Sequence, residues 1–353
     1  MKISVIPASE LDAKLVSRWR QLQSADPVLA SPFFCPEFTQ VVAQVRNDVE
    51  IAIIERGHVV VGLFPFQRVS SRVACPVGGL LSDYHGVISE QDFAIDPRDL
   101  LAGCQLVAWD FDHVPTAQSF FAPFSRMVAG SPVIDISQGF EAYALTRRQA
   151  GSEQLSQCAM KARRLARDIG PLRFEFQSED GSALGQVLDW KSRQYRATGG
   201  NDIFQQDWCR AIVTKAHARS STEFSGRLAL LFAGDNLVAG HFGLWTPKIG
   251  HYWFPAYNAT FARYSPGQLL LLKMAEEAAS LGVRLIDLGK GQAPYKQQLM
   301  SYEVPLFAGS VELPSLLRLR REGERRLRSS LRNNRFVRRV RDYLRGAPGG
   351  SYS

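Results

Sequence analysis

Two stretches of the sequence, VEIAIIERGHVVVGLFPFQ at residues 49–67 and RLALLFAGDNLVAGHFGLW at residues 227–245, have the same organisation. Each consists of two apolar runs around a short, polar, glycine-containing turn, which is the pattern of a β-hairpin. The second run also holds a glycine at a similar place, Gly62 in one stretch and Gly240 in the other. The sequence therefore predicts two copies of one hairpin.

Each predicted hairpin is followed by a predicted helix and then by a short strand that ends in aspartate. These aspartates are Asp110 and Asp287, which follow Gly62 and Gly240 by 48 and 47 residues. The near-equal spacing favours an internal duplication, although hairpin-helix-strand units also recur in unrelated proteins. We expect a mixed α/β layer with a large helix on the sheet.

The composition is that of a globular protein, with 45% hydrophobic and 22% charged residues. A length of 353 residues suggests two domains, at about 100 to 200 residues per domain. The N-terminus does not resemble a secretory signal, and every apolar run is shorter than the roughly 20 residues of a spanning helix. Five scattered cysteines indicate neither disulfides nor a zinc site. We expect a cytoplasmic protein.

The net charge of +8 lies in the C-terminal tail. Residues 316–345 contain 12 arginines and three acidic residues, so the remainder of the chain has a net charge of −1. Apolar residues at helical spacing predict an amphipathic basic helix there: Leu327, Leu331, Val337, Val340 and Leu344. Such a helix suits an anionic membrane surface on the inner face, a cyclic dinucleotide or RNA. A solvated terminal helix is the plainer interpretation, and we expect residues 346–353 to be disordered.

The segment RYSPGQ at residues 263–268 stands between a predicted strand at 251–257 and a predicted helix at 268–281. Proline in a first helical turn has no N–H to lose, and glycine permits close approach of a ligand. The free N–H groups of such a helix end favour a phosphate. This pattern predicts a site for the pyrophosphate of coenzyme A, and an ordinary Ser-Pro helix start is the alternative.

The segment LIDLGKG at residues 285–291 ends a predicted strand in two glycines, and Tyr295 and Lys296 begin the next helix. Glycines let this strand part from its neighbour, so that a thioester can lie with its carbonyl near a strand N–H. Asp287 can then take the proton of the attacking group, and Tyr295 can protonate the departing thiolate. In the alternative interpretation Asp287 caps a loop and Tyr295 is a packed aromatic.

Two further groups suit a polyhydroxylated acceptor. SDYHG at residues 82–86 combines a carboxylate, a phenol and an imidazole, which is ordinary for carbohydrate recognition but also for a polar turn over the core. A predicted helix at 184–196 places Lys191, Gln194 and Tyr195 on one face. These groups are candidates for the acceptor side of a cleft.

Six motifs together resemble the CelD/BcsL-type acetyltransferases, which are GNAT-superfamily proteins associated with cellulose and exopolysaccharide synthesis and similar in build to the FemAB transferases. The motifs are SPFFCPEF (31–38), PVGGLLSDYHGVI (76–88), WKSRQY (190–195), HYWFPAYN (251–258), RYSPG (263–267) and DLGKGQAPYK (287–296). The resemblance runs from about Trp19 to Leu313. One departure is Pro266, which stands where the donor loop of GNAT proteins has its first glycine.

The resemblance implies a tandem GNAT-like acyl-CoA N-acyltransferase fold. We expect an N-terminal, acceptor-side half at 1–155, a basic linker helix at 156–170, a donor-binding catalytic half at 171–314 and an arginine-rich tail at 315–353. The implied reaction transfers an acetyl or other acyl group from acyl-CoA, without a metal, to an amino or hydroxyl group. The implied acceptor is a bacterial exopolysaccharide or cell-envelope glycan precursor, such as a lipid-linked sugar.

The predicted site residues fall into three groups. The catalytic candidates are Asp287, Tyr295, Lys296 and His241, of which His241 also suits a buried core histidine. The donor candidates are Trp253, Phe254, Arg263, Ser265, Gly267, Gln268, Gly289 and Gly291, and the acceptor candidates are Asp83, Tyr84, His85, Lys191, Gln194 and Tyr195. Two other functions remain open: a FemAB-like transferase that uses aminoacyl-tRNA, and a non-catalytic, nucleotide-responsive accessory protein of polysaccharide assembly.

Overall fold

The computed structural model describes residues 1–291 and 293–333, and in this part of the chain thirteen strands form one mixed sheet. The strands are β1 (Lys2–Pro7), β2 (Val49–Arg56), β3 (Val59–Ser70), β4 (Val73–Cys75), β5 (Ile88–Ser89), β6 (Ala108–Pro115), β7 (Ser125–Asp135), β8 (Leu172–Glu175), β9 (Ser225–Ala233), β10 (Asn236–Trp245), β11 (Ile249–Tyr257), β12 (Leu285–Asp287) and β13 (Tyr302–Glu312). Their order along the sheet is β1-β2-β3-β4-β6-β13-β7-β12-β11-β10-β9-β8, and β5 pairs with β3.

This strand order repeats one unit from both ends of the sheet. β2 and β3 form an antiparallel hairpin, and β9 and β10 form another, as the two sequence stretches predict. After the hairpins, β6 lies parallel to β4, and β12 lies parallel to β11. Asp110 and Asp287 are the third residues of β6 and β12 and occupy equivalent places. The topology therefore has the internal repeat that the spacing favours.

The last strand of each unit is exchanged between the halves. β7 follows β6 in the sequence but pairs with β12, whereas β13 follows β12 but pairs with β6. The two exchanged strands pair with each other in the middle of the sheet. Strand Tyr302–Glu312, predicted as part of the half at 171–314, thus lies between two strands of the first half. Because the two halves share one sheet and exchange strands, the sheet does not divide at the predicted domain boundaries, which stay predictions.

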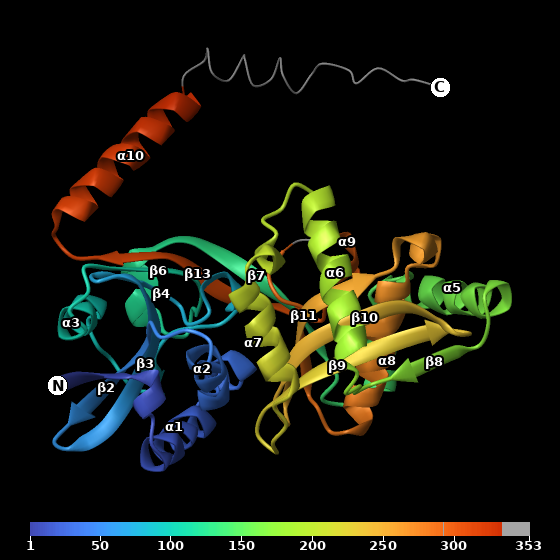
Figure 1. Cartoon of the computed structure of the whole chain (residues 1–353), viewed down its shortest axis with the longest axis horizontal. Coiled ribbons are helices and arrows are strands. Elements are labelled where there is room, and N and C mark those ends of the chain that lie inside the picture. Colours follow the sequence, from blue (N-terminus) through green and yellow to red (C-terminus); the bar gives the residue numbers. More distant parts are fainter. Residues whose placement is uncertain (292, 334–353) are drawn as a thin grey trace.

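Ten helices of the described residues cover the sheet or extend from it (Figure 1): α1 (Ala13–Ala25), α2 (Pro36–Ala43), α3 (Pro97–Gly103), α4 (Phe140–Gln149), α5 (Gln154–Asp168), α6 (Gly181–Ala197), α7 (Asp207–His217), α8 (Pro266–Ser280), α9 (Pro294–Leu299) and α10 (Leu316–Asn333). Helices α1 and α2 share one hydrophobic cluster with α6 and α7, so this core joins both halves. Helix α8 packs with α4 and α5 in a second cluster. The two clusters place β9, β10 and β11 between two helical layers.

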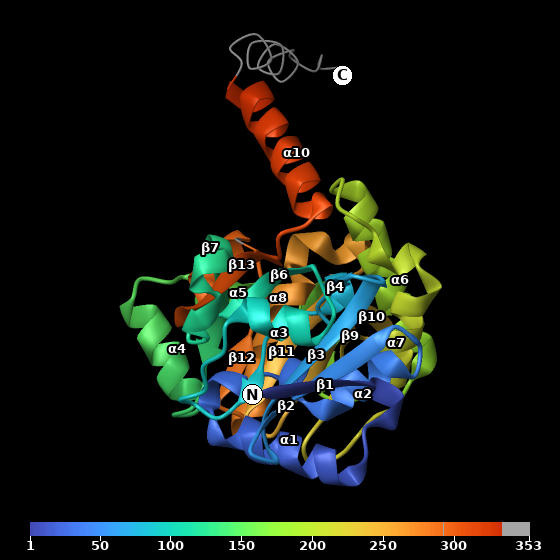
Figure 2. The same cartoon turned by 90° about the vertical axis from the view of Figure 1, so that its left-hand side faces the viewer.

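The tail begins as predicted with a helix, α10, which projects away from the sheet in both views (Figures 1 and 2). Arg321 in its second turn pairs with Asp110 of β6 and Glu312 of β13. The predicted apolar stripe from Leu327 onward lies outside the side chains that the structure describes, as does the predicted disorder at 346–353. No helix in the described ranges has the length and apolar character that crossing a bilayer requires.

Candidate active site

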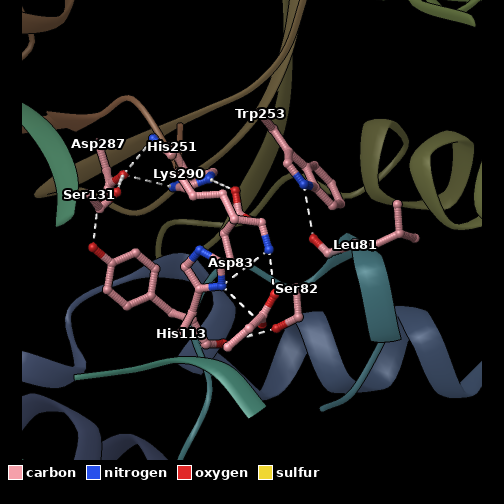
Figure 3. A network of polar contacts seen from close by, with 12 residues as sticks. Leu81, Ser82, Asp83, His113, Ser131, His251, Trp253, Asp287 and Lys290 are labelled. Atoms are coloured by element: carbon pink, nitrogen blue, oxygen red, sulfur yellow. Dashed lines mark hydrogen bonds and ion pairs between the residues drawn. The ribbon is translucent and has the colours of Figure 1, made fainter. Parts of the chain in front are cut away.

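Asp287, the last residue of β12, is the centre of a buried polar network (Figure 3). Its carboxylate is held by three donors. The Tyr84 hydroxyl donates to Oδ2, while Ser131 Oγ at 2.6 Å and the Gly289 N–H at 2.7 Å donate to Oδ1. Since a carboxylate has about four lone-pair sites, one site remains for a further donor.

A buried histidine joins this carboxylate to a second one (Figure 3). Parallel pairing of β11 with β12 sets His251 beside Asp287. The imidazole of His251 is 0% exposed, with Nε2 2.8 Å from Asp83 Oδ2 and Nδ1 3.6 Å from Asp287 Oδ1. Burial alone raises the pKa of Asp83, but the hydrogen bond and charge of His251 outweigh burial and lower it. The imidazole thus hydrogen-bonds to Asp83 of the first half and lies within ion-pair distance of Asp287 of the second, and its Nδ1 has no hydrogen-bond partner among the described residues.

The turn after β12 has to contain glycine. Gly289 has a φ of +68°, and a Cβ placed there would lie 3.0 Å from Asp83 Oδ2. Lys296 of α9 donates to the carbonyls of Gly289 and Lys290 at 3.0 and 2.8 Å. An ammonium has three N–H groups, so one remains free for a ligand. Burial lowers the pKa of Lys296, and the charges of Asp83 and Asp287 oppose this shift.

A gap between strands opens beside this turn. β11 and β12 pair only as far as His251 and Asp287, after which the Leu288 N–H donates to Pro132 of β7 at 2.9 Å. The chain after β12 therefore follows β7, while β11 continues to Tyr257 paired with β10 on its other side. This is the separation between strands that the two glycines predict.

The N-terminus of α8 lies beside β11. Ser265 precedes the helix in the left-handed region at φ 52°, and no side chain caps the first turn. Lys161 of α5 contacts Ser265 Oγ at 2.8 Å, which brings a cation to the same helix end. A Cβ on Gly267 would meet only Tyr257, at 3.6 Å, so the approach to the helix is open. The Tyr252 hydroxyl donates to the Gly267 carbonyl at 3.2 Å and connects β11 to this turn.

The equivalent helix of the first half, α3, differs in chemistry. Its N-cap residue Asp96 accepts from the Arg98 N–H at 2.8 Å, so a carboxylate already occupies the anion position. Asp110, the counterpart of Asp287, is paired with Arg321 at 2.9 Å. Of the two repeated units, only the second has a helix start without a side-chain cap, which is the arrangement that suits an anion.

Helix α6 contributes to the rim of the network. Lys191 Nζ lies 5.1 Å from the centre of the Tyr195 ring. Burial lowers the pKa of Lys191 to about 8, with the charge of Lys296 adding to the effect. Burial raises the pKa of Tyr195 to about 12, to which the charge of Asp83 contributes. The structure therefore groups these predicted residues around Asp83 and Lys296, whereas Gln194 is exposed and contacts Lys191.

Two predicted histidines lie outside the network. His241 is 0% exposed, its Nε2 accepts from the Trp253 N–H at 3.1 Å, and burial lowers its pKa well below the usual value. His85 Nε2 accepts from two main-chain N–H groups of β6, and burial lowers its pKa to about 3. Both rings stay neutral and satisfy main-chain donors. The geometry argues against His241 as a base and against His85 as an acceptor ligand.

Four predicted donor residues have structural contacts instead. Trp253 and Phe254 are 7% and 3% exposed within the core that joins the halves, where Trp253 Nε1 donates to the Leu81 carbonyl. Arg263 lies over the ring of its neighbour Tyr264, 4.7 Å from the ring centre. Gln268 in the first turn of α8 accepts from Gln154 of α5 at 2.5 Å. Roles of these residues in donor binding stay predictions.

Several residues of the site were not predicted from the sequence. His251 stands in the motif HYWFPAYN, and its role becomes visible when β11 pairs with β12, which sets His251 beside Asp287. Ser131 carries no sequence signal, because β7 reaches Asp287 only through strand exchange. Lys290 contacts Asp112 at 2.5 Å and His113 at 3.3 Å, and so ties the glycine turn to β6. In the ranges that the structure covers, no cluster of three potential metal ligands occurs.

Comparison with known proteins identifies the chemistry of the second half. Residues 154–297 match the family described as an acetyltransferase (GNAT) domain. The chain therefore contains a GNAT acetyltransferase domain, which implies an acyl-CoA donor. No curated protein matches the sequence.

Solved structures resemble the whole chain in fold. A structure of FemX has a TM-score of 0.56 at 10% identity, over 90% of this chain and 98% of that chain. A tandem GNAT protein from the clavulanic acid biosynthesis pathway has a TM-score of 0.50 at 12% identity, over 89% and 100%. The C-terminal domain of a putative lysylphosphatidylglycerol synthetase from Agrobacterium fabrum has 0.52 at 15% identity, over 86% and 93%. These likenesses confirm the mixed α/β, tandem GNAT fold and carry no further argument.

Proposed function

We propose that this protein, with its GNAT acetyltransferase domain at 154–297, transfers an acyl group from acyl-CoA directly to a sugar hydroxyl or amino group. The proposed acceptor is a bacterial exopolysaccharide or cell-envelope glycan precursor. The observation that carries the proposal is the glycine turn after β12. Next to it are a carboxylate with one free lone-pair site, Asp287, and an ammonium with one free N–H, Lys296. Helix α8 of the same half adds a start without a side-chain cap.

Each end of the donor has matching groups in the second half. The α8 N-terminus, with Lys161 beside it, suits the pyrophosphate. Tyr252 and Tyr295 interact and belong to the same cluster below the gap, so the pantetheine arm would pass between aromatic walls. The thioester would then lie at the end of β12, where Gly289 leaves room.

The proposed mechanism needs no covalent enzyme intermediate. Asp287 takes the proton of the acceptor hydroxyl or amine as its oxygen or nitrogen attacks the thioester carbon. Lys296 stabilises the negative charge that develops on the carbonyl oxygen. As the tetrahedral species collapses, the C–S bond breaks and Tyr295 gives its proton to the departing sulfur. Burial raises the pKa of Tyr295 to about 12, so the phenol is protonated at neutral pH.

The glycan acceptor and the tail partner rest on sequence features. The motif resemblance to CelD/BcsL-type acetyltransferases supports a polysaccharide acceptor. The twelve arginines at 316–345 support contact of the tail with an anionic membrane or a cyclic dinucleotide. A steep salt dependence of donor binding would instead favour aminoacyl-tRNA as the donor.

The first prediction concerns donor binding. Gly267→Trp fills the approach to the α8 N-terminus, and because a Cβ there meets only Tyr257 at 3.6 Å, the core is not disturbed. We expect calorimetry to show saturable binding of acetyl-CoA to the wild type and at least tenfold weaker binding to the variant. Gly181→Trp, at the start of α6 where a Cβ meets nothing within 4 Å, is the matched control. Equal binding by all three proteins would place the donor elsewhere.

The second prediction concerns the base. Asp287→Asn keeps the size of the side chain but removes the negative charge that accepts the proton. We expect acyl transfer to fall by at least a hundredfold, in line with the usual contribution of a general base, while the Kd for acetyl-CoA changes less than threefold. Asp189→Asn on α6, where Asp189 forms an exposed ion pair with Arg210 of α7, is the control. Undiminished transfer by Asp287→Asn would remove the carboxylate from the mechanism.

A further inference from the structure

Two adjoining cavities lie on the sheet face that carries Asp287. The inner cavity, of about 440 Å³, is lined by both Asp287 and Tyr84. The outer cavity has a volume of about 420 Å³. Pro27, Ile249, Leu285 and Tyr302 line both. Each volume is within the range of ordinary small-molecule sites.

The two cavities follow one another along the strands. Asp287 pairs with Val133 and lines the inner cavity with it, whereas Leu285 pairs with Asp135, which lines the outer one. These register positions are two residues apart, or about 7 Å at the usual rise of a strand. The combined space is therefore elongated, and it is longer than a single sugar ring.

The inner cavity is mainly apolar, with a few polar groups. Its apolar walls include Val28, Val133, Ile249, Leu285, Val304 and Pro305. Ser31 also lines it, is 6% exposed, and its Oγ has no hydrogen-bond partner within the described ranges. A buried hydroxyl without a partner costs free energy unless a ligand supplies one.

The outer cavity contains a similar group with a charge. Glu37 of α2 is 4% exposed; Arg20 contacts its Oε1, but its Oε2 finds no partner among the described residues. A carboxylate oxygen only accepts, so the missing group is a donor such as a hydroxyl or amine. Three cations line this cavity, Arg20, Lys248 and Arg284, together with four carboxylates, among them Glu37 and Asp135. This balance gives no excess of positive charge for a phosphate.

From these features we propose that the two cavities bind the acceptor as a neutral sugar chain of at least two units, with the attacking unit in the inner cavity at Asp287. The apolar walls suit the C–H faces of sugar rings, and Ser31, Glu37 and Asp287 suit their hydroxyl groups. Tyr302, which lines both cavities and is 43% exposed, provides a ring for stacking at their junction. This inference rests on the proposed function and excludes a nucleotide-activated monosaccharide as the ligand.

The test measures sugar binding without the donor. Calorimetry and saturation-transfer NMR would use glucose, a β-1,4-linked glucose dimer and tetramer, the matching tetramer of the neutral sugar N-acetylglucosamine, and UDP-glucose. We expect at least one tetramer to bind at least tenfold more tightly than the monosaccharide and than UDP-glucose. Failure of both tetramers to bind, or tighter binding of UDP-glucose, would overturn the proposal.

One variant localises the binding. Val28→Trp fills the inner cavity from the segment that covers it, and Val69→Trp, at a site 67% exposed on β3, is the matched control. We expect Val28→Trp to weaken tetramer binding at least tenfold and Val69→Trp to leave it within twofold. Thermal unfolding checks that both variants fold. Glu37→Gln is a milder change in the outer cavity, and we expect it to weaken tetramer binding severalfold. Equal tetramer binding by the wild type and all three variants would refute the assignment.

Binding of acetyl-CoA is an independent measurement on the same variants. Acetyl-CoA should bind the wild type and Val28→Trp with the same Kd, since the inner cavity is lined by no residue of α8. If acetyl-CoA binds neither the wild type nor the variants, the proposed function fails, while the sugar measurements still test ligand binding in the two cavities. If acetyl-CoA binds but no sugar does, only the present inference fails.

Discussion

At the scale of single residues, nearly all hydrogen-bonding positions of the two charged groups at the site are occupied by other groups of the protein. Asp287 accepts from Tyr84, Ser131 and Gly289, and Lys296 donates to two carbonyls. Each group is left with about one free position, which restricts both the place and the direction from which a substrate can bind. Such preorganisation is what stabilises charge in a transition state.

Lys191 allows a prediction about pH. Its pKa in the folded protein is lowered to about 8 by burial, whereas an unfolded lysine titrates near about 10.4. Below pH 8 the folded state therefore holds an unfavourable charge, and this destabilisation disappears as the pH rises toward the unfolded pKa. We expect Lys191→Met to raise the free energy of unfolding more at pH 7 than at pH 10, as measured by urea denaturation.

The exposed Lys215 on α7 is the control for this experiment. Lys215→Met should change the free energy of unfolding by the same amount at both pH values. A pH-independent effect of Lys191→Met as well would show that the Lys191 ammonium is fully hydrated in the folded protein.

At the scale of elements, the two helix starts and the exchanged strands distinguish the halves. α8 begins without a side-chain cap, whereas Asp96 caps α3. Only one of these two equivalent helices is therefore suited to an anion. β13 pairs with β6 on one side and β7 on the other. Leu306 and Val311 of β13 are 0% exposed, so this strand is part of the interior rather than an edge.

The position of β13 predicts the effect of two truncations. A chain that ends at residue 314 lacks α10 and the Arg321 ion pairs, which are partly exposed and contribute about 0 to 1 kcal/mol. A chain that ends at residue 300 also lacks β13, which leaves β6 and β7 without a shared partner. We expect chemical denaturation to show one cooperative transition for the first chain and none for the second.

The outcome that would contradict this expectation is cooperative unfolding of the chain that ends at residue 300, at a similar denaturant midpoint. It would mean that each half folds by itself and that β13 only adds to a complete core. The chain that ends at residue 314 serves as the internal control, because it retains every strand.

At the scale of the whole molecule, the site belongs to both halves at once. Asp83, Tyr84 and Ser131 come from the first half, and His251 and Asp287 come from the second. The exchanged strands and the core that joins α1 and α2 to α6 and α7 hold these groups in one rigid arrangement. In the proposed function, the acceptor and the donor would therefore bind to separate surfaces that meet at Asp287.

The sequence alone predicted the parts of this protein that depend on neighbouring residues. The two hairpins, the start of α8 at Ser265 and Pro266, and the glycine turn after Asp287 all follow from turn chemistry and hydrophobic periodicity. These features depend on which φ angles and which hydrogen bonds a short segment allows. They also led to the GNAT resemblance, through the motifs around Asp287 and Tyr295.

Only the tertiary structure decided which distant segments meet. The exchange of β7 and β13, the hydrogen bond between His251 and Asp83, and the paired cavities all depend on segments more than a hundred residues apart in the chain, and no local pattern encodes such pairings. The physical reason is that strand edges offer the same main-chain donors and acceptors to any partner, so the choice among partners is made by the packing of the whole core.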